Sequence, residues 1–325
     1  MKLHTDKKLF RQAVQFTADQ MNIPAVYIEK DYWVTFALHA IFSNDIGKDS
    51  VFKGGTALSK CYNLIERFSE DIDLVVLRRE GESNSRLTNK LRKISKVVAD
   101  ALPELEITGL TQKMGMNRKT AYSYTKEFQG IYGQVRDVVV VEATWLGNFE
   151  PYKTMTISSF VGSMMCNNGQ IDIAGAYGLL PFELFVLDPT RTICEKIMSL
   201  VRFSYGENPI EDLKKKVRHI YDLHQLLKQK EFSGFFDSKA FEEMLLKVAN
   251  DDVASYKNSN EWLIHHPNEA IIFRDLERVW NELKGVFNVE FKNLVYGSFP
   301  IETAVLLTLK RIRERLSSIR WTVEL

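Results

Sequence analysis

Two aspartates separated by one residue are the first side chains of this sequence that could do chemistry. Asp71 and Asp73 lie in the run DIDLVV, whose apolar residues favour a β-strand. Side chains two apart on a strand point to the same face, so the two carboxylates repel each other unless a cation lies beside them. Carboxylate oxygens are ligands that suit Mg²⁺. The pair predicts a metal site, with a solvated strand end as the alternative because the pattern is short and common.

Two glycines precede this strand. Gly54 and Gly55 follow the short run VFK and open a helical stretch at Thr56. Glycine lets a phosphate approach the backbone, and free N–H groups at a helix start attract anions. Glycines alone would also fit a tight turn. The combination of strand, glycines, helix and D-x-D strand is more specific, and it predicts a phosphate-binding turn beside the metal-binding pair.

A third acid stands in the strongly β-forming run VVVVEATW. Burying Glu142 there without a partner would be costly. If its strand lies next to DIDLVV, Glu142 completes a three-carboxylate site for two metal ions. The alternative is that Glu142 faces solvent or pairs with a base such as Arg136. Asp137, at the edge of the run, is a weaker candidate.

The elements that must position these residues follow from periodicity. Residues 5–43 predict two helices interrupted near Asn22–Pro24, and further helices are predicted over 56–68 and 83–102. Strand-like runs form a mixed sheet of about five to seven strands; they cover 51–55, 71–77, 104–110, 121–128, 135–147 and 154–162.

Helical periodicity dominates after about Pro189. It predicts helices over 190–204, 211–228, 238–249, 268–284 and 300–318. The fold class is therefore α+β: a mixed-sheet part with N-terminal helices, followed by a helical part. We expect two domains, residues 1–185 and 186–325, with their boundary between about 180 and 190.

Composition restricts the cellular setting. The formal net charge is +1, so any surface for nucleic acid must be local. Three cysteines without a C-x-x-C pair indicate a reducing compartment. The start MKLHTDKKLFRQ lacks the apolar core of a signal peptide, and the sequence has no 18-residue apolar run. We expect a cytoplasmic protein that does not associate with a membrane.

The stretch GGTALSK…RFSEDIDL resembles the polymerase-beta-type nucleotidyltransferases, and most closely the AbiE-type (AbiEii/AbiGii-like) toxins. The resemblance continues through EKDYWVT (29–35), CEKIMSL (194–200) and RHIYDLHQL (218–226). It implies a nucleotidyltransferase core that uses Mg²⁺, two ions in all, to move a nucleoside monophosphate from an NTP to an acceptor hydroxyl. The acceptor in such proteins is often RNA, such as a tRNA 3′ end. The resemblance also implies that the protein is the toxin of a toxin–antitoxin or phage-defence pair, with a separate antitoxin protein as its partner.

The resemblance also implies roles for single residues. Asp71 and Asp73 match the metal-binding pair, while Lys196 would meet the triphosphate and Asp222 would belong to the active site. The positions at the nucleotide's phosphates are Gly54, Gly55, Thr56 and Ser69. One position departs from the family pattern, because His219 stands where an aspartate is expected.

Several alternatives stay open at these positions. A lysine such as Lys196 is more often solvated on sequence alone, and Asp222 could pair with Arg218 four residues before it. In EKDYWVT, Lys30 and Asp31 could lie near substrate, or the charges could be capping or paired groups beside core aromatics.

Local basic clusters could bind an acceptor. One consists of Lys214, Lys215, Lys216 and Arg218, where RNA phosphates could be held, although charge runs are usually solvated faces. Two other functions fit the same residues: a nucleotide-sensing or partner-binding module with a vestigial site, and an NTP-dependent phosphotransferase.

Overall fold

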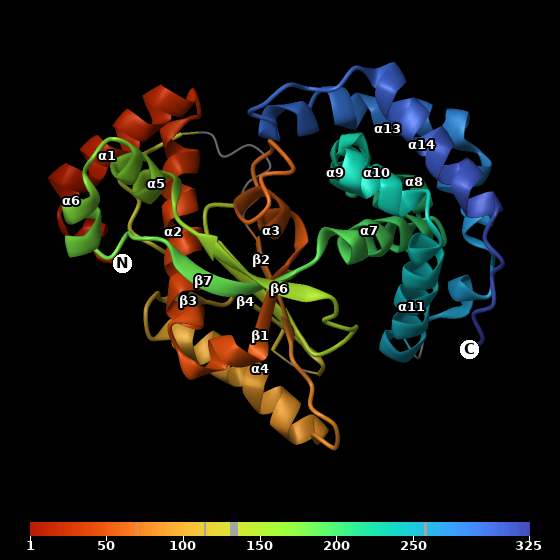
Figure 1. Cartoon of the computed structure of the whole chain (residues 1–325), viewed down its shortest axis with the longest axis horizontal. Helices are drawn as coiled ribbons and strands as arrows, with labels where there is room; N and C mark the ends of the chain where they lie inside the picture. Colours follow the sequence, from red (N-terminus) through yellow and green to blue (C-terminus); the bar gives the residue numbers. More distant parts are fainter. Residues whose placement is uncertain (70, 114, 131–135, 257–258) are drawn as a thin grey trace. The chain divides into compact units, whose positions relative to one another are not determined.

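The computed structural model describes residues 1–69, 71–113, 115–130, 136–256 and 259–325, which fall into two compact units (Figure 1). The first unit contains residues 1–63, 68–145 and 152–187. The second contains residues 188–325 together with two short stretches from earlier in the chain, 64–67 and 146–151.

A seven-stranded mixed sheet forms the centre of the first unit, with the strand order β3-β4-β5-β2-β1-β7-β6. β2 runs parallel to β5 and β1 runs parallel to β7, while the other neighbours are antiparallel. The strands are β1 (Ser50–Lys53), β2 (Asp71–Val76), β3 (Glu104–Leu105), β4 (Asn117–Tyr122), β5 (Val139–Thr144), β6 (Tyr152–Ile157) and β7 (Phe182–Leu187).

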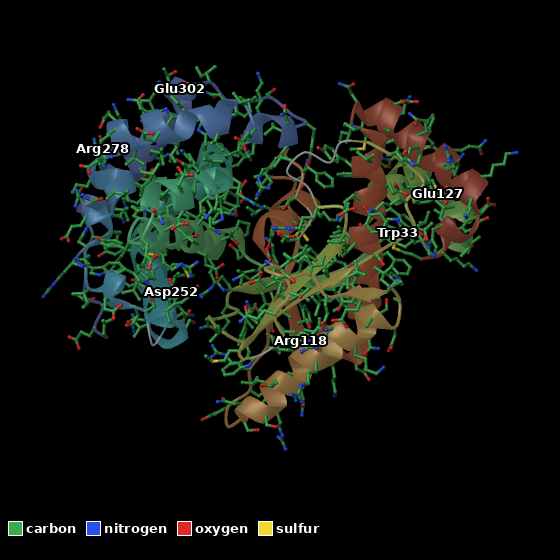
Figure 2. The ribbon with its side chains drawn as sticks, turned by 180° about the vertical axis from the view of Figure 1, so that it is seen from behind. Trp33, Arg118, Glu127, Asp252, Arg278 and Glu302 are labelled. Atoms are coloured by element: carbon green, nitrogen blue, oxygen red, sulfur yellow. The ribbon has the colours of Figure 1, made fainter. Side chains whose placement is uncertain are left out.

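Helices complete the first unit. They are η1 (Leu3–Thr5), α1 (Lys7–Met21), α2 (Ala25–Phe42), η2 (Asp45–Asp49), α3 (Gly54–Lys60), α4 (Asn84–Ala99), α5 (Phe160–Asn167) and α6 (Ile171–Ala176). α2 and α4 both pack against β2 and β5. Trp33 of α2 is buried and stacks on the ring of Tyr124, with 5.4 Å between ring centroids (Figure 2).

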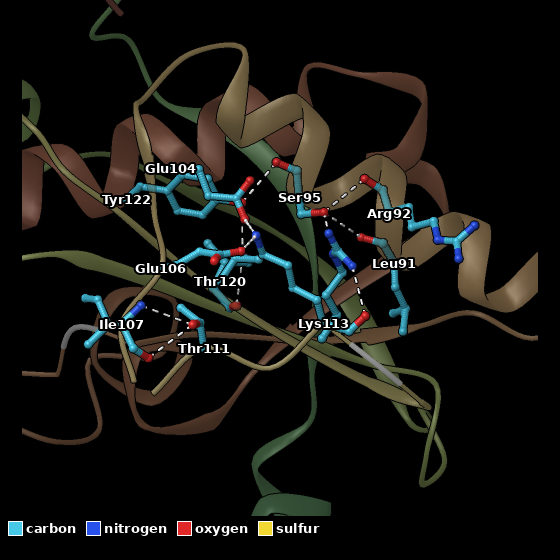
Figure 3. Close-up of polar contacts among 12 residues, drawn as sticks. Leu91, Arg92, Ser95, Glu104, Glu106, Ile107, Thr111, Lys113, Thr120 and Tyr122 are labelled. Carbon is cyan, nitrogen blue, oxygen red and sulfur yellow. Dashed lines mark hydrogen bonds and ion pairs between the residues drawn. The ribbon is translucent and has the colours of Figure 1, made fainter. Parts of the chain in front are cut away.

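Side-chain contacts join α4 to the β3–β4 edge of the sheet (Figure 3). The Tyr122 hydroxyl donates to the Ser95 carbonyl (3.0 Å), and Arg118 Nε donates to the Ser95 hydroxyl (2.7 Å). Lys113 pairs with Glu104 (3.1 Å) and Glu106 (2.8 Å) at the same edge. These contacts fix β4, the neighbour of the strand that carries Glu142.

The second unit is helical. Its elements are α7 (Pro189–Phe203), α8 (Pro209–Lys214), α9 (Val217–Lys228), α10 (Lys230–Phe236), α11 (Lys239–Ser255), η3 (Glu261–Leu263), η4 (Pro267–Glu269), α12 (Ile271–Arg274), α13 (Leu276–Asn288), η5 (Phe291–Leu294) and α14 (Glu302–Ser317). Asp188 caps α7 by accepting from the Thr190 N–H (2.9 Å), ahead of a proline at the first helical position. Trp280, buried in α13, donates to Glu302 of α14 (3.1 Å; Figure 2).

The α+β class predicted from the sequence is confirmed, but several elements differ. The strand predicted over 121–128 is wrong beyond Tyr122, where β4 ends, and it did not include residues 117–120 of β4. The helix expected over 211–228 is two helices, which separate at Lys215–Lys216, and that over 268–284 divides at Asp275. The sequence patterns did not predict β7, α5, α6 or α10.

Candidate active site

The two aspartates lie together on one face of β2. The strand alternates half-buried Asp71 and Asp73 with buried Ile72 and Leu74, as a period of two requires. β5 lies directly beside β2, and in this parallel pairing Asp73 is the register partner of Glu142. Partners in register point to the same side of a sheet, so three acids share one face.

Asp73 is the acid most affected by this arrangement. Burial raises the pKa of Asp73 to about 7, and the negative charges of Asp71 and Glu142 act in the same direction. Lys53, the register partner of Asp73 on β1, and Lys119 oppose the rise. A carboxyl in such surroundings gains most from an added cation.

The other two acids already have cationic partners. Arg136 Nη1 donates to both oxygens of Asp71 (3.1 and 3.2 Å). Glu142 accepts from Lys119 (2.8 Å) and from the Asn117 amide (3.0 Å). Burial alone would raise the pKa of Glu142, but the Lys119 contact lowers it below its usual value. The sequence left open a pair of Glu142 with Arg136. In the structure Glu142 pairs with Lys119, and Arg136 pairs with Asp71.

The donor set fits a divalent cation in kind, because the three acids supply neighbouring carboxylate oxygens. Within the described part of the chain, no group of three or more His, Cys, Asp and Glu side chains is arranged to hold a metal ion. Arg136 and Lys119 form ion pairs with two of the three carboxylates, those of Asp71 and Glu142. The expected three-carboxylate set for two metal ions therefore stays a prediction.

The glycine turn approaches the acids closely. Gly54 has a φ of +81°, and a Cβ at that position would lie 2.2 Å from Asp73 Oδ2. Any other residue would have both a strained backbone and a clash with the carboxylate. Gly54 and Gly55 form the first turn of α3. Glycine at position 54 is thus needed for the packing of Asp73, whatever else the turn binds.

Thr56 and Ser69 connect α3 to the start of β2. The buried Thr56 hydroxyl donates to the Asp71 carbonyl (2.6 Å) and lies 3.0 Å from the Ser69 hydroxyl. These bonds hold the backbone of Asp71 against the helix that follows the glycines. Both residues have a positional role here, and their role at a nucleotide stays a prediction.

The EKD part of EKDYWVT proves to be buried and paired. Glu29 and Lys30 bond to backbone groups of the chain before β5, and Asp31 pairs with Lys60. Asp31 also accepts from the Phe160 N–H (2.7 Å). The alternative in which these charges are paired beside core aromatics is the one that matches the structure.

A second ionic cluster lies within the helical unit. Asp222 of α9 is fully buried, and Arg67 donates to both of its oxygens (2.7 and 2.8 Å). Lys196 of α7 pairs with the same carboxylate (2.7 Å). Burial by itself would raise the pKa of Asp222, but Arg67 and Lys196 lower it to about 2. Asp222 is thus engaged by Arg67 and Lys196, rather than by Arg218 as the local spacing allowed.

His219 lies one helical turn before Asp222. Burial lowers the pKa of His219 well below its usual value, and the charges of Lys196 and Lys216 act in the same direction. Its Nδ1 is buried and has no hydrogen-bond partner among the described residues. The imidazole is therefore neutral, unlike the aspartate that the resemblance leads us to expect at this position.

The basic cluster before α9 is partly neutralised. Lys214 pairs with Glu211 (2.8 Å), Lys215 pairs with Asp212 (3.0 Å), and the Lys216 ammonium lies 4.4 Å from the centroid of the Phe203 ring.

Arg67, Lys119 and Asn117 are site residues that the sequence patterns did not indicate. Lys119 lies opposite Glu142 on the neighbouring strand, but the strand predicted over 121–128 did not include it, and Arg67 had no local signal.

Comparison with known proteins gives a family. The model of the family described as "Nucleotidyl transferase AbiEii toxin, Type IV TA system" matches residues 37–303. The comparison with curated proteins gave no match. No helix in the described parts of the chain is long and apolar enough to span a membrane. The matched range includes β2, β5, α7 and α9, and the chain belongs to the AbiEii nucleotidyl transferase toxins of type IV toxin–antitoxin systems.

Proposed function

We propose that this nucleotidyl transferase requires Mg²⁺ and moves a nucleoside monophosphate from an NTP to an acceptor hydroxyl at the acid face of β2 and β5. The observation that supports this best is the position of Asp73 between Asp71 and Glu142, with a pKa raised to about 7. The negative charges of Asp71 and Glu142 destabilise the ionised form of Asp73, and functional sites keep such arrangements because a bound cation relieves them.

The reaction would proceed by in-line displacement. The acceptor oxygen forms a bond to the α-phosphorus, the bond between that phosphorus and the α–β bridging oxygen breaks, and pyrophosphate leaves. Mg²⁺, when bound, would supply charge neutralisation and a lower pKa for the attacking hydroxyl. Asp71 and Asp73 would hold the ions and Glu142 would be the third ligand. For Glu142 to accept the hydroxyl proton, its contact with Lys119 must open, because that contact lowers its pKa.

The nucleotide's phosphates would lie at the glycine turn. Gly54, Gly55, Thr56 and Ser69 are assigned to them because the turn is held directly against the acid strand. Family membership supports Lys196 as a residue that binds the nucleotide's triphosphate, and Asp222, fixed by Arg67, would orient its ammonium. The buried position of this ionic cluster supports a precise orientation, since both partners are held by charged hydrogen bonds.

The acceptor would be RNA, such as a tRNA 3′ end. Lys215 and Arg218 are exposed side chains of the basic cluster, and we assign the contacts with the RNA phosphates to them. Family membership supports a cognate antitoxin protein as the partner that controls the activity.

The experiment compares isosteric acid-to-amide variants. Asp71→Asn and Asp73→Asn should each lower transfer at least about a hundredfold, as loss of a charged ligand of about 3 kcal/mol implies. Asp100→Asn is the matched control, because Asp100, just after α4, is exposed and pairs only with Lys96 of that helix among the described residues. Mg²⁺ should be needed by the wild type, with EDTA abolishing transfer. Activity of Asp71→Asn equal to that of Asp100→Asn would contradict the proposal.

A further inference from the structure

Three consecutive charged residues of α2 are buried. Glu29 and Lys30 have no exposed surface and Asp31 is 5% exposed. Buried charges are stabilised only where hydrogen bonds and opposite charges satisfy them. The partners of Glu29 and Lys30 are therefore a guide to what these two residues hold in place.

Glu29 and Lys30 hold the two flanks of one chain segment. The Glu29 carboxylate accepts from the N–H groups of Glu127 (2.8 Å) and Phe128 (3.2 Å). The Lys30 ammonium donates to the carbonyls of Arg136 (2.8 Å) and Val138. Adjacent residues of one helix thus fix the backbone just before and just after residues 131–135, and β5 begins at Val139.

The second flank carries the cation that contacts the acid strand. Lys30 holds the carbonyl of Arg136, and the guanidinium of the same Arg136 reaches Asp71. The Arg136 side chain is 38% exposed and that of Asp71 is 22% exposed. Both side chains of the pair are thus partly open to solvent, so water and dissolved ions reach this contact, while the backbone beneath it is held by the buried Lys30.

We propose that Arg136 is an exchangeable counter-ion: it neutralises Asp71 in the nucleotide-free protein and moves to the phosphates of the NTP when a divalent cation takes its place. The inference rests on the proposed function, because it needs a cation at Asp71. It adds Arg136 as a substrate-binding residue and Lys30 as the residue that positions it.

Charge and geometry lead to this assignment. A cation on Asp71 competes with the guanidinium for the same two oxygens, which frees the Arg136 donor that held them to bind an anion beside the cation. The anion that arrives with the cation is the triphosphate. A planar guanidinium binds two phosphate oxygens at once through parallel N–H groups, whereas the ammonium of Lys119 is a compact point charge without this fork of donors.

The test uses two binding measurements and no turnover. The first is Mn²⁺ binding to the nucleotide-free protein, followed by electron paramagnetic resonance. The second is binding of the four α,β-methylene ribonucleoside triphosphates at saturating Mn²⁺, followed by calorimetry. Arg136→Gln should bind Mn²⁺ about three- to tenfold more tightly, because the competitor is gone. It should bind the best analogue about tenfold or more weakly, because one charged phosphate contact is lost.

Controls separate this result from structural damage. Lys126→Gln removes a neighbouring ion pair, that of Lys126 with Asp137 (2.6 Å), and should change neither affinity. Arg136→Lys should restore part of the analogue affinity. A loss of both affinities in Arg136→Gln, or no change in either, would overturn the inference while Mn²⁺ binding by the wild type still supports the metal site. A wild type whose Mn²⁺ binding is absent, or is unaffected by Asp71→Asn, would overturn the metal site and this inference with it.

Discussion

At Gly54 the backbone lies so close to the Asp73 carboxylate that a single added carbon atom would displace it. Gly54→Ala places a Cβ 2.2 Å from Asp73 Oδ2 on a backbone with φ of +81°. We expect a loss of about 1–3 kcal/mol in the free energy of unfolding, from strain and displacement of Asp73, and a severe loss of transfer. Urea denaturation and an NTP-transfer assay measure the two effects.

A second glycine isolates the contact from the strain. Gly81 has a φ of +72°, and a Cβ there would meet nothing within 4 Å. Gly81→Ala should therefore lose stability through strain alone and keep full transfer activity. Equal activity of the two variants would show that the approach of Gly54 to Asp73 has no functional consequence.

Asp222 makes the free energy of unfolding depend on pH in the acid range. Its pKa is about 2 in the folded protein and 3.8 in the reference state, so the folded state binds its proton more weakly. The stabilisation is therefore fully present above about pH 4 and is lost as the pH falls towards 2. It amounts to about 2 kcal/mol. Denaturation curves between pH 5 and 2 should show this loss in the wild type.

The Asp222→Asn variant is the comparison for this effect. It should be less stable than the wild type at pH 7, because Arg67 and Lys196 are left buried without their anion. It should also lose less stability between pH 4 and 2, because the titrating group is gone. An unchanged acid dependence would show that other carboxylates cause it.

At the scale of elements, α2 determines the position of the chain before β5. Lys30→Met removes the donor for two carbonyls, and we expect a loss of about 2–3 kcal/mol in the free energy of unfolding. Analogue binding should weaken as well, because Arg136 loses the support of its backbone. Lys8→Met, at an exposed site of α1, is the control. A Lys30→Met protein with wild-type stability would contradict the role of α2.

Local patterns predicted the elements that depend on local residues. The period of two in DIDLVV and the β-forming run VVVVEATW predicted β2 and β5, and their adjacency put Glu142 beside Asp73. The pattern over 121–128 was misleading because the N–H groups of Glu127 and Phe128 bond to Glu29 instead of a neighbouring strand. A side chain 98 residues away thus overrides the strand propensity of this segment.

Partners far apart in the sequence could not be predicted. Arg67 and Asp222 are 155 residues apart, and Arg136 and Asp71 are 65 apart. Nothing in the spacing of these residues indicates the contact, since it depends on how the elements pack. The acids of the candidate site were therefore predictable as residue types, while the cations that neutralise them required the structure.

At the scale of the whole molecule, charge limits how an acceptor is chosen. The formal net charge of +1 provides no general attraction for nucleic acid, so the RNA acceptor that we propose would have to be bound through local contacts. Part of the most prominent basic cluster is already paired with Glu211 and Asp212. A protein of this kind fits a selective acceptor better than indiscriminate binding to nucleic acid.

The transfer of label from an NTP to RNA tests the central claim most directly. The protein is incubated with total RNA and Mg²⁺, in parallel with α-labelled and γ-labelled forms of each of the four NTPs. We predict that RNA gains label from the α position of at least one NTP and from the γ position of none, because the α–β bond breaks and pyrophosphate leaves. The same label should be absent with Asp71→Asn. Label from the γ position alone would contradict nucleotidyl transfer and establish phosphotransfer instead.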